Sequence, residues 1–378
     1  MKIIVLGNQA QALVNFWSVL IRRMRAGGHE VVCCAPPGDA QADAALAASG
    51  TPVLHYRLDR KGLNPLRDAR TFVDLARLFR AEKPDILFAS TIKPVIYGCM
   101  AARLARVPHI YATITGLGYA FEADSFFKKC VNILSALLYR TALNGAEGVF
   151  FQNPDDIAVF RRQHILKQDA RVLTARGVGV DTARFAPAPP PPGPPVFLLV
   201  ARLLEAKGLA EYAEAARMLK KRHPAARFQV LGPPEQGLGS VSLERMRDWE
   251  AQGGIEYLGQ TRDVRPYMAA AHVLVLPSWR EGTPTSVMEA MSMGRPAVVT
   301  NAPGCREVVR DKVNGRLVPV RDAQALAAAM ESYILDPESI ARMGAAGRDL
   351  AVAEFDAMKV ADRILADMRI SANSGEAR

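Results

Sequence analysis

The chain contains 378 residues, of which 49% are hydrophobic and 23% are charged, values typical of a soluble globular protein long enough for two domains. Its five cysteines include no CxxC pair and no metal-ligand spacing, which argues against a disulfide scaffold or a zinc module. The formal net charge is +10, and residues 1–185 carry +9 of it (24 Lys and Arg against 15 Asp and Glu), so an anionic partner is expected for the first half.

Neither a secretion signal nor a membrane-spanning segment is predicted. The first residues, MKIIVLGN, begin directly as a strand, without a charged start, a long apolar core and a cleavage site. No uninterrupted apolar run reaches the roughly 18 residues that a spanning helix needs. The most apolar helical stretch, 130–143, is interrupted by Asn132 and Arg140 and is interpreted as a core helix. We therefore expect a cytoplasmic protein.

Strands and helices alternate along the first half. Buried strands are predicted at 2–7, 30–35, 86–91, 109–114 and 148–153. Helices are predicted at 10–26, 66–81, 95–105 and 126–143. The stretch APAPPPPGPP (186–195) follows and is predicted to be an extended linker, because proline at this density cannot join a helix or a sheet interior.

The second half repeats the alternation. Strands are predicted at 196–201, 228–232, 272–277, 296–300 and 315–320, and the chain is predicted to be helical from about 324 to 369. This order predicts an α/β fold with two doubly wound parallel sheets. The predicted domains are 1–185 and 196–350. A C-terminal segment, 351–378, is expected to pack its helix back on the first domain and to end in a polar tail.

The stretch REGTPTSVMEAMSMGRPAV (280–298) joins two of these strands. Thr283 suits a helix N-cap, Pro284 the first helical position, and Gly294 the position just past the helix end. The loop and first turn should therefore lie at the carboxyl edge of a parallel sheet, where ligands bind. Free N–H groups and small residues at 283–286 suit a phosphate group.

Two carboxylates flank this helix start. Glu281 precedes it and is expected to project over the same site, whereas Glu289 lies about a turn and a half beyond Pro284, too far to cap the helix. Carboxylates near an anion site but not on it can accept hydrogen bonds from sugar hydroxyls. The alternative is a solvated helix face with two ordinary acids, and the spacing alone leaves both interpretations open.

A second motif, VARLLEAKG (200–208), follows the first strand of the second half. Arg202 and Lys207 are expected at the same carboxyl edge as the helix start at 283–286, where two cations would bracket a diphosphate. The alternative is that they are surface cations flanking Glu205.

The ordered set ARLLEAKG, LGQTRDV, PSWREGTPTSVMEAMSMGRPAVVT and NAPGCREVV resembles the donor-binding domain of retaining glycosyltransferases of family 4, which have the GT-B fold. In the first half, residues 60–98 and ATITGLGYAF (112–121) resemble bacterial enzymes that extend undecaprenyl-diphosphate-linked sugars. Those enzymes include N-acetylgalactosaminyl and hexosyl transferases of glycan and O-antigen assembly. The resemblance spans residues 1–350 and implies two Rossmann-like domains facing across a cleft, the first for the acceptor and the second for the nucleotide sugar.

The resemblance also implies residue roles. Glu281 would contact the transferred sugar and support the positive charge at its anomeric carbon, and Glu289 would bind the ribose. The implied donor-binding residues are Arg202, Lys207, Gly282, Thr283, Pro284, Thr285, Ser286 and Glu289. Because cations and a helix start can stabilise the departing diphosphate, no metal and no cofactor are expected, and the chain has no D-x-D sequence.

Acceptor-side candidates lie in loops that follow strands of the first domain. They are Gly7, Asn8, Lys93, Thr115, Gly116 and Gly118, and for Lys93 the alternative is a role in capping the helix at 95–105. No GxGxxG sequence is present, which disfavours an NAD or FAD enzyme. Many relatives place a histidine in the 112–121 loop; here the nearest, His109, lies earlier in the strand, and no residue is assigned in its place.

The expected function is transfer of a HexNAc or hexose from a UDP-sugar to an undecaprenyl-diphosphate-linked sugar, with retention, at the inner face of the cytoplasmic membrane. Basic residues on helices of the first domain are expected to contribute a patch against anionic lipid: Arg22, Arg23, Arg25, Arg67, Arg70, Arg77, Arg80, Lys128 and Lys129. One alternative is a nucleotide-sugar epimerase of the same architecture, which is not expected to carry the E-x7-E pair. Another is a nucleic-acid-binding protein, although no helix-turn-helix, RNP-like or zinc pattern is present.

Overall fold

The computed structural model describes residues 1–60, 62, 64–117, 126–237 and 239–370, and for 126–129 only the backbone. The chain divides into two compact units. Unit 1 comprises Met1–Val178 and the segment that starts at Ala357, and unit 2 comprises Gly179–Asp356.

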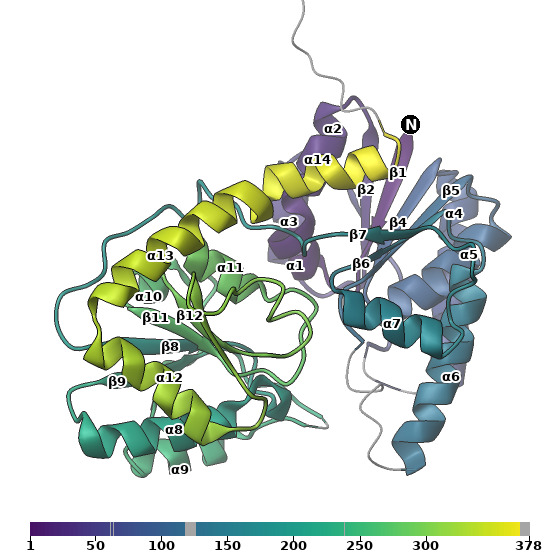
Figure 1. Ribbon diagram of the computed structural model, residues 1–378. Helices are drawn as coiled ribbons and strands as arrows, with labels where there is room; N and C mark the ends of the chain where they lie inside the picture. The colour runs from purple at the N-terminus through teal and green to yellow at the C-terminus, as the bar shows by residue number, and fades with distance from the viewer. Residues whose placement is uncertain (61, 63, 118–125, 238, 371–378) are drawn as a thin grey trace, which may run out of the picture. The chain divides into compact units, whose positions relative to one another are not determined.

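Unit 1 contains a seven-stranded parallel sheet in the order β3-β2-β1-β4-β5-β6-β7 (Figure 1). Its strands are β1 (Lys2–Leu6), β2 (Glu30–Ala35), β3 (Val53–His55), β4 (Ile86–Ser90), β5 (His109–Ile114), β6 (Gly148–Phe151) and β7 (Val172–Thr174). Its helices are α1 (Ala10–Ala12), η1 (Leu13–Trp17), α2 (Ser18–Ala26), α3 (Ala40–Ala48), α4 (Pro65–Glu82), η2 (Pro94–Gly98), α5 (Cys99–Leu104), α6 (Phe126–Leu143), α7 (Pro154–Arg162) and α14 (Ala357–Asp367).

Unit 2 contains a six-stranded parallel sheet in the order β10-β9-β8-β11-β12-β13. Its strands are β8 (Val196–Val200), β9 (Arg227–Leu231), β10 (Glu256–Tyr257), β11 (Val273–Leu276), β12 (Ala297–Thr300) and β13 (Gly315–Val318). Its helices are η4 (Glu205–Lys207), α8 (Leu209–Arg222), α9 (Leu243–Ala251), α10 (Arg265–Ala269), α11 (Thr285–Ser292), α12 (Ala323–Leu335), α13 (Glu338–Leu350) and η5 (Ala351–Phe355).

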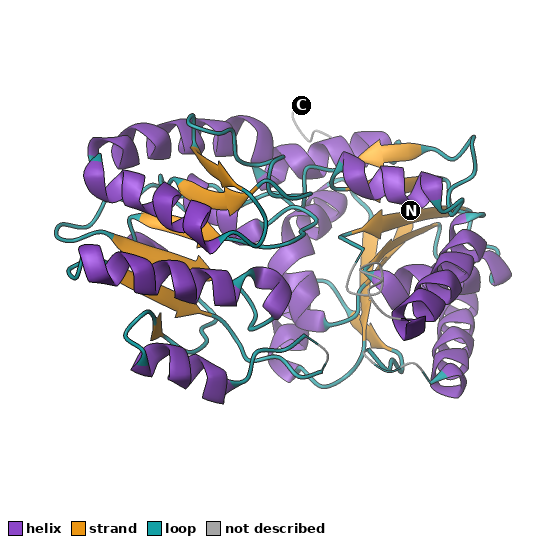
Figure 2. Ribbon diagram, turned by 60° about the horizontal axis from the view of Figure 1, so that its bottom comes forward, coloured by secondary structure: helices purple, strands orange, loops and turns teal. Residues whose placement is uncertain are grey.

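Helices cover both faces of each sheet (Figure 2). In unit 1, strand residues alternate between two cores: Leu6 packs in the core that includes Phe79 of α4, and Val5 packs in the core that includes Met24 of α2. This alternation follows from the period of two in a β-strand. Because both faces are covered, the strands are nearly continuous apolar runs, as expected of parallel sheets.

The predicted α/β class with two doubly wound parallel sheets is confirmed, and every predicted strand is present. The strands that the sequence did not predict are β3, β7 and β10, which lie at sheet edges and have only two or three residues. Helix α11 begins at Thr285 with Pro284 as N-cap, one residue later than predicted. Gly294 lies just past the helix end with a φ of 77°, as predicted.

The proline-rich segment belongs to unit 2 instead of joining the units. Buried Arg295 donates to the carbonyl oxygens of Ala188 (2.7 Å) and Pro189 (3.0 Å). The division between the units falls earlier, after Val178. The described part of the chain includes no helix long and apolar enough to cross a membrane.

Helix α14, although last in the chain, packs in unit 1. Its Asp362 accepts a hydrogen bond from Nε of Arg23 in α2 at 2.7 Å. Its apolar side chains, including Val360 and Ile364, join the core of that face. Tyr111 of β5 donates its hydroxyl to the carbonyl oxygen of Met368 at 3.0 Å. The sheet of unit 1 is therefore covered in part by residues that come after all of unit 2.

Candidate functional site

The two motifs of unit 2 meet at the point where its strand order reverses. From β8 the chain proceeds outward through β9 and β10, and it then returns to β11, which pairs with β8 on the other side. Ligands of open α/β sheets bind outside the carboxyl ends of the strands at such a reversal. Arg202 and Lys207 follow β8, and Glu281 follows β11. The topology therefore places both motifs at one edge of the sheet, as predicted.

Lys207 and Glu281 form an ion pair across this point. The Lys207 ammonium contacts Oε1 of Glu281, and both side chains are largely buried, with 17% and 14% of their surfaces exposed. The same Oε1 accepts a hydrogen bond from the hydroxyl of Ser278 at 2.7 Å. Ser278 is fully buried, and its carbonyl oxygen accepts from the Thr300 hydroxyl. The carboxylate is therefore held from two sides.

A glycine permits this contact. Gly208 follows Lys207 with a φ of 72°, and a Cβ atom there would lie 2.1 Å from the carbonyl oxygen of Pro277. The backbone amide of Trp279 donates to the carbonyl oxygen of Ala206 at 2.9 Å. Any side chain at position 208 would push apart the two loops that carry Lys207 and Glu281.

Arg202, which was expected to bind the donor diphosphate, pairs with a carboxylate of the protein. Its guanidinium donates to Oε2 of Glu235 at 2.9 Å, and 56% of the arginine side chain is exposed. The sequence placed Arg202 at the correct edge, but it could not reveal a carboxylate 33 residues away. A diphosphate would have to draw Arg202 from Glu235.

The first turn of α11 lacks a side-chain cap. Its N-cap is Pro284, whose side chain cannot accept a hydrogen bond, although its carbonyl oxygen accepts from the backbone amides of Val287 and Met288. Thr285 and Ser286 are half-buried and supply the first N–H groups of the helix. Just before them, Gly282 is approached so closely by Gly304 that a Cβ atom on Gly304 would lie 2.4 Å from the Gly282 carbonyl oxygen. The turn therefore offers backbone donors and the partial positive charge of a helix start to an anion.

Glu289 lies one turn further along α11. Its carboxyl makes no hydrogen bond or ion pair with the part of the chain that the structure describes. Burial raises the pKa of the Glu289 carboxyl from 4.5 to about 8, and the charge of Arg184 acts in the opposite direction. The side chain is half-buried, and a carboxyl with so strongly raised a pKa is a candidate for ligand binding.

In unit 1 the predicted acceptor-side residues follow β1 and β5. Gly7 is buried, and its carbonyl oxygen accepts from the Tyr56 hydroxyl at 2.8 Å. Asn8 is the next residue and is half-buried. Thr115 and Gly116 follow β5, and Gly116 has a φ of 126°. The last candidate of this loop, Gly118, lies outside the described residues.

Lys93 is engaged by the protein itself. Its ammonium contacts Oδ1 of Asp68 at 2.6 Å and the carbonyl oxygens of Asp59 and Gly62, each at 2.7 Å. The other Asp68 oxygen accepts from the Tyr97 hydroxyl at 2.9 Å. Lys93 holds the N-cap position of η2, but its side chain does not cap that helix. The ammonium thus anchors the loop before α4.

The predicted basic patch is not one surface. Helices α2 and α4, which carry most of its residues, pack in cores on opposite faces of the sheet. Arg23 pairs with Asp362, and Arg67 pairs with Asp59 at 3.0 Å. Arg70, Arg77 and Arg80 are exposed on α4. The side chains of Lys128 and Lys129 lie outside the described residues.

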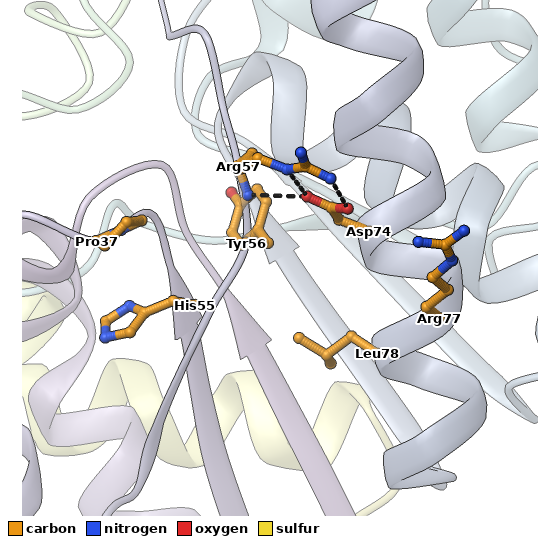
Figure 3. Close-up of a pocket in the computed structure, with 7 residues that line it drawn as sticks. All are labelled: Pro37, His55, Tyr56, Arg57, Asp74, Arg77 and Leu78. Atoms are coloured by element: carbon orange, nitrogen blue, oxygen red, sulfur yellow. Dashed lines mark hydrogen bonds and ion pairs between the residues drawn. The ribbon is translucent and has the colours of Figure 1, made fainter.

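A pocket of about 410 Å³ lies elsewhere in unit 1 (Figure 3). It is lined by Pro37, His55, Tyr56, Arg57, Asp74, Arg77 and Leu78. Figure 3 shows the Arg57 guanidinium forked onto the Asp74 carboxylate, with both distances 2.6 Å. This pair keeps the pKa of Asp74 below its usual value. None of the predicted site residues lines this pocket.

Ser278 has no predicted role, although it directly follows a predicted strand and precedes Glu281 by three residues. A small hydroxyl residue at that spacing could have indicated a partner for the carboxylate. Where the structure describes the chain, no group of three or more His, Cys, Asp or Glu side chains is arranged to hold a metal ion.

Comparison with known proteins matches both halves of the chain. Residues 14–175 match the glycosyl transferase 4-like domain, and residues 181–350 match the glycosyl transferases group 1. A Campylobacter jejuni protein, N,N'-diacetylbacillosaminyl-diphospho-undecaprenol alpha-1,3-N-acetylgalactosaminyltransferase, is 26% identical over 97% of each chain. An Escherichia coli UDP-Gal:alpha-D-GlcNAc-diphosphoundecaprenol alpha-1,3-galactosyltransferase is 26% identical over 80% of each chain.

Solved structures share the fold over the whole length. Anabaena HepE in complex with UDP and glucose has a TM-score of 0.78 at 18% identity, covering 98% of this chain and 99% of that one. Sucrose-phosphate synthase from Thermosynechococcus elongatus has a TM-score of 0.79 at 18% identity, covering 98% of both chains. Two parallel-sheet units, each matched by its own glycosyltransferase domain, make this chain a member of the GT-B glycosyltransferases that combine a 4-like first domain with a group 1 second domain.

Proposed function

We propose that this protein transfers a HexNAc or hexose from a UDP-sugar to an undecaprenyl-diphosphate-linked sugar, with retention of anomeric configuration, in cell-surface polysaccharide assembly. The observation that carries the proposal is the group of residues at the strand reversal of unit 2: Lys207, Glu281, the start of α11, which has no side-chain cap, and half-buried Glu289. The names of the two relatives support the substrate classes, since both include an undecaprenyl-linked diphosphate sugar and one includes UDP-Gal.

In this proposal the donor diphosphate binds between Lys207 and the first amides of α11, from Thr285 and Ser286. A helix start and an ammonium together neutralise the charge that builds up on the leaving group. Arg202 would exchange Glu235 for the outer phosphate. Glu289 would accept hydrogen bonds from the ribose hydroxyls, which would give its half-buried carboxyl the partners that it lacks among the described residues.

Glu281 would face the transferred sugar. In the ligand-free protein its charge is balanced by Lys207, so donor binding would shift Lys207 toward phosphate and leave the carboxylate to support the positive charge at the anomeric carbon. The bond from that carbon to the UDP oxygen breaks as the bond to the acceptor hydroxyl forms on the same face. The hydroxyl proton passes to the departing phosphate oxygen. No protein nucleophile is required in this scheme.

The proposed reaction needs no metal, because Lys207 and the helix start supply the electrophilic groups. Transfer should therefore continue in the presence of excess EDTA. Loss of transfer in EDTA, with recovery on addition of Mg²⁺ or Mn²⁺, would contradict this part of the proposal.

We also propose that the protein works against an anionic lipid surface. Helix α6 exposes an apolar stripe of Ile133 (62%), Leu134 (58%) and Leu137 (56%), and it packs on the same face of the sheet as α4 with its exposed arginines. Apolar side chains insert among lipids, and arginines are attracted to anionic headgroups. Flotation with phosphatidylglycerol vesicles should depend on salt and should weaken in Leu134→Ser/Leu137→Ser; equal flotation with neutral vesicles would contradict the charge contribution.

The decisive experiment is a donor screen. Purified protein is incubated with UDP- and GDP-sugars, with and without short-chain polyprenyl-diphosphate sugars, and nucleoside diphosphate release is followed. The expected result is UDP release that requires acceptor and that falls sharply in Glu281→Ala and Lys207→Ala. Glu256→Gln is the matched control, because this carboxylate of unit 2 is already paired with Arg227 at 2.7 Å. Turnover of the donor without acceptor would favour an epimerase instead.

A further inference from the structure

Unit 1 has its own strand reversal, between β1 and β4. From β1 the chain proceeds outward through β2 and β3, and it then returns to β4, which pairs with β1 on the other side. Leu6 and Ala89 are partners at the carboxyl ends of these strands. Asn8 and Thr91 each lie two residues beyond that pair. These two side chains therefore lie at the edge where a parallel sheet binds its ligand.

Both connections that leave this point contain a π-helical turn. The turn η1 lies in the helix after β1, and η2 opens the helix after β4. Gly98 in η2 fits against β1 so closely that a Cβ atom there would lie 2.3 Å from a methyl group of Leu6. Short π-helical turns are rare and occur frequently at functional sites.

Thr91 has a strained backbone. Its φ of 73° lies in the left-handed region, which a β-branched residue adopts only at a cost. Seven non-glycine residues have positive φ in the part of the chain that is described, and none of the other six is β-branched. Four of those six close helices, where a left-handed residue is common: Lys83, Arg106, His164 and Arg369. Thr91 instead joins the end of a strand to the start of a helix.

The hydroxyl of Thr91 is buried and has no hydrogen-bond partner among the residues that the structure describes. The same is true of Thr113 in β5, whose side chain is 1% exposed and whose register partner in β4 is Ser90, next to Thr91. Buried hydroxyls are nearly always hydrogen-bonded in native proteins, so two adjacent exceptions require a cause. Backbone strain and unpaired hydroxyls both lower stability, and together they are typical of a position whose role is to bind a ligand.

The charge at this edge indicates which ligand. The Lys93 ammonium, two residues after Thr91, is neutralised by Asp68. Three polar groups of the described chain close to this reversal are neutral: the hydroxyls of Thr91 and Thr113 and the amide of Asn8. Neutral donors and acceptors suit the hydroxyl groups of a sugar ring better than they suit a diphosphate.

We infer that Thr91 hydrogen-bonds a hydroxyl group of the acceptor's terminal sugar, and that its strained backbone is retained because it holds the hydroxyl group in that place. This inference rests on the proposed transferase function and adds to it a substrate-binding residue on the acceptor side. It also separates two tasks in unit 1: Thr91 binds the sugar, while Lys93 anchors the loop before α4.

The test compares four proteins: wild type, Thr91→Gly, Thr91→Ser and Lys83→Gly. Glycine at 91 relieves the strain and removes the hydroxyl group, and serine keeps the hydroxyl group. Lys83→Gly is the matched control, because it relieves a positive φ at the end of α4, and the Lys83 side chain is exposed. Urea midpoints, UDP affinity by calorimetry and the KM for a short-chain polyprenyl-diphosphate sugar are measured for each.

Both glycine variants should unfold at higher urea than wild type. Only Thr91→Gly should raise the acceptor KM, by about ten-fold, as expected for one lost hydrogen bond, with UDP affinity unchanged. Thr91→Ser should keep the wild-type KM. An unchanged urea midpoint in Thr91→Gly would refute the inference that the backbone at Thr91 is strained. An unchanged acceptor KM in the same variant would refute the inference that Thr91 contacts the sugar. If wild type transfers sugar to no acceptor, the proposed function is wrong and so is the sugar contact at Thr91. The urea midpoints would still show whether the backbone at Thr91 is strained.

Discussion

Replacing Glu289 with glutamine should make the protein less sensitive to alkaline pH. The carboxyl loses its proton near pH 4.5 when it is free in the unfolded chain, but burial raises its folded-state pKa to about 8. Between these values the folded state holds a proton that the unfolded state has released. The free energy of unfolding of the wild type should therefore fall as pH rises through this window and should level off on either side of it.

The size of the effect follows from the shift. A difference of roughly 3.5 pH units corresponds to about 5 kcal/mol at 1.36 kcal/mol per unit. Glutamine has nearly the same shape but carries no charge at any pH, so this contribution is absent in Glu289→Gln. The free energy gained by the variant relative to wild type should grow by a few kcal/mol, and at most about 5 kcal/mol, from pH 4.5 to pH 8.5.

Urea unfolding followed by circular dichroism at half-unit pH steps would measure this difference, since all other titrating groups contribute equally to both proteins. Glu256→Gln is the control with the opposite sign. Arg227 lowers the pKa of Glu256, so wild type should lose its advantage over that variant as pH falls. If wild type and Glu289→Gln kept a constant difference from pH 5 to pH 9, the burial argument for Glu289 would be refuted.

Three further predictions follow from the geometry of unit 2. First, UDP binding at pH 7 should release up to about one proton, because ribose hydroxyls donate to the carboxylate form of Glu289. Calorimetry in buffers of different ionisation enthalpy should show this proton release in wild type and not in Glu289→Gln. Second, Gly208→Ala should lower the free energy of unfolding by more than about 1 kcal/mol and abolish transfer, since its Cβ would lie 2.1 Å from the Pro277 carbonyl oxygen. Retained turnover would show that the loops carrying Lys207 and Glu281 can separate without loss of activity. Third, Arg295→Met should lower the free energy of unfolding in urea by about 2–5 kcal/mol, because the buried guanidinium donates to five carbonyl oxygens. Arg342→Met, at an exposed position, should leave this free energy nearly unchanged.

The fold could be predicted because the long strands are continuous apolar runs between helical stretches. Short edge strands such as β3 and β10 were not predictable, since two or three residues carry no periodic pattern and depend on a neighbouring strand for their hydrogen bonds. The sequence predicts the start of α11 one residue too early, because Thr283 and Pro284 are residue types preferred at the N-cap and the first helical position, whereas Pro284 itself takes the N-cap position.

The candidate site shows where sequence reasoning stops. Lys207 and Glu281 are 74 residues apart and could be placed together because topology alone brings the ends of β8 and β11 to one edge. The partner of Lys93 could not be foreseen in this way: Asp68 lies on a helix face, and no motif relates the two positions. Thr91 was also not foreseen, since a backbone angle has no signature in a single threonine.

The position of α14 has a consequence for how the chain folds during synthesis. A ribosome releases residues in order, so all of unit 2, Gly179–Asp356, is synthesised before the helix that completes the cover of one face of the first sheet. Until then the apolar side chains that meet Ile364 and Leu365 have no cover. We expect a released chain truncated after residue 356 to protect unit 2 from protease while unit 1 is still cut, and equal protection of both would show that unit 1 closes without its last helix.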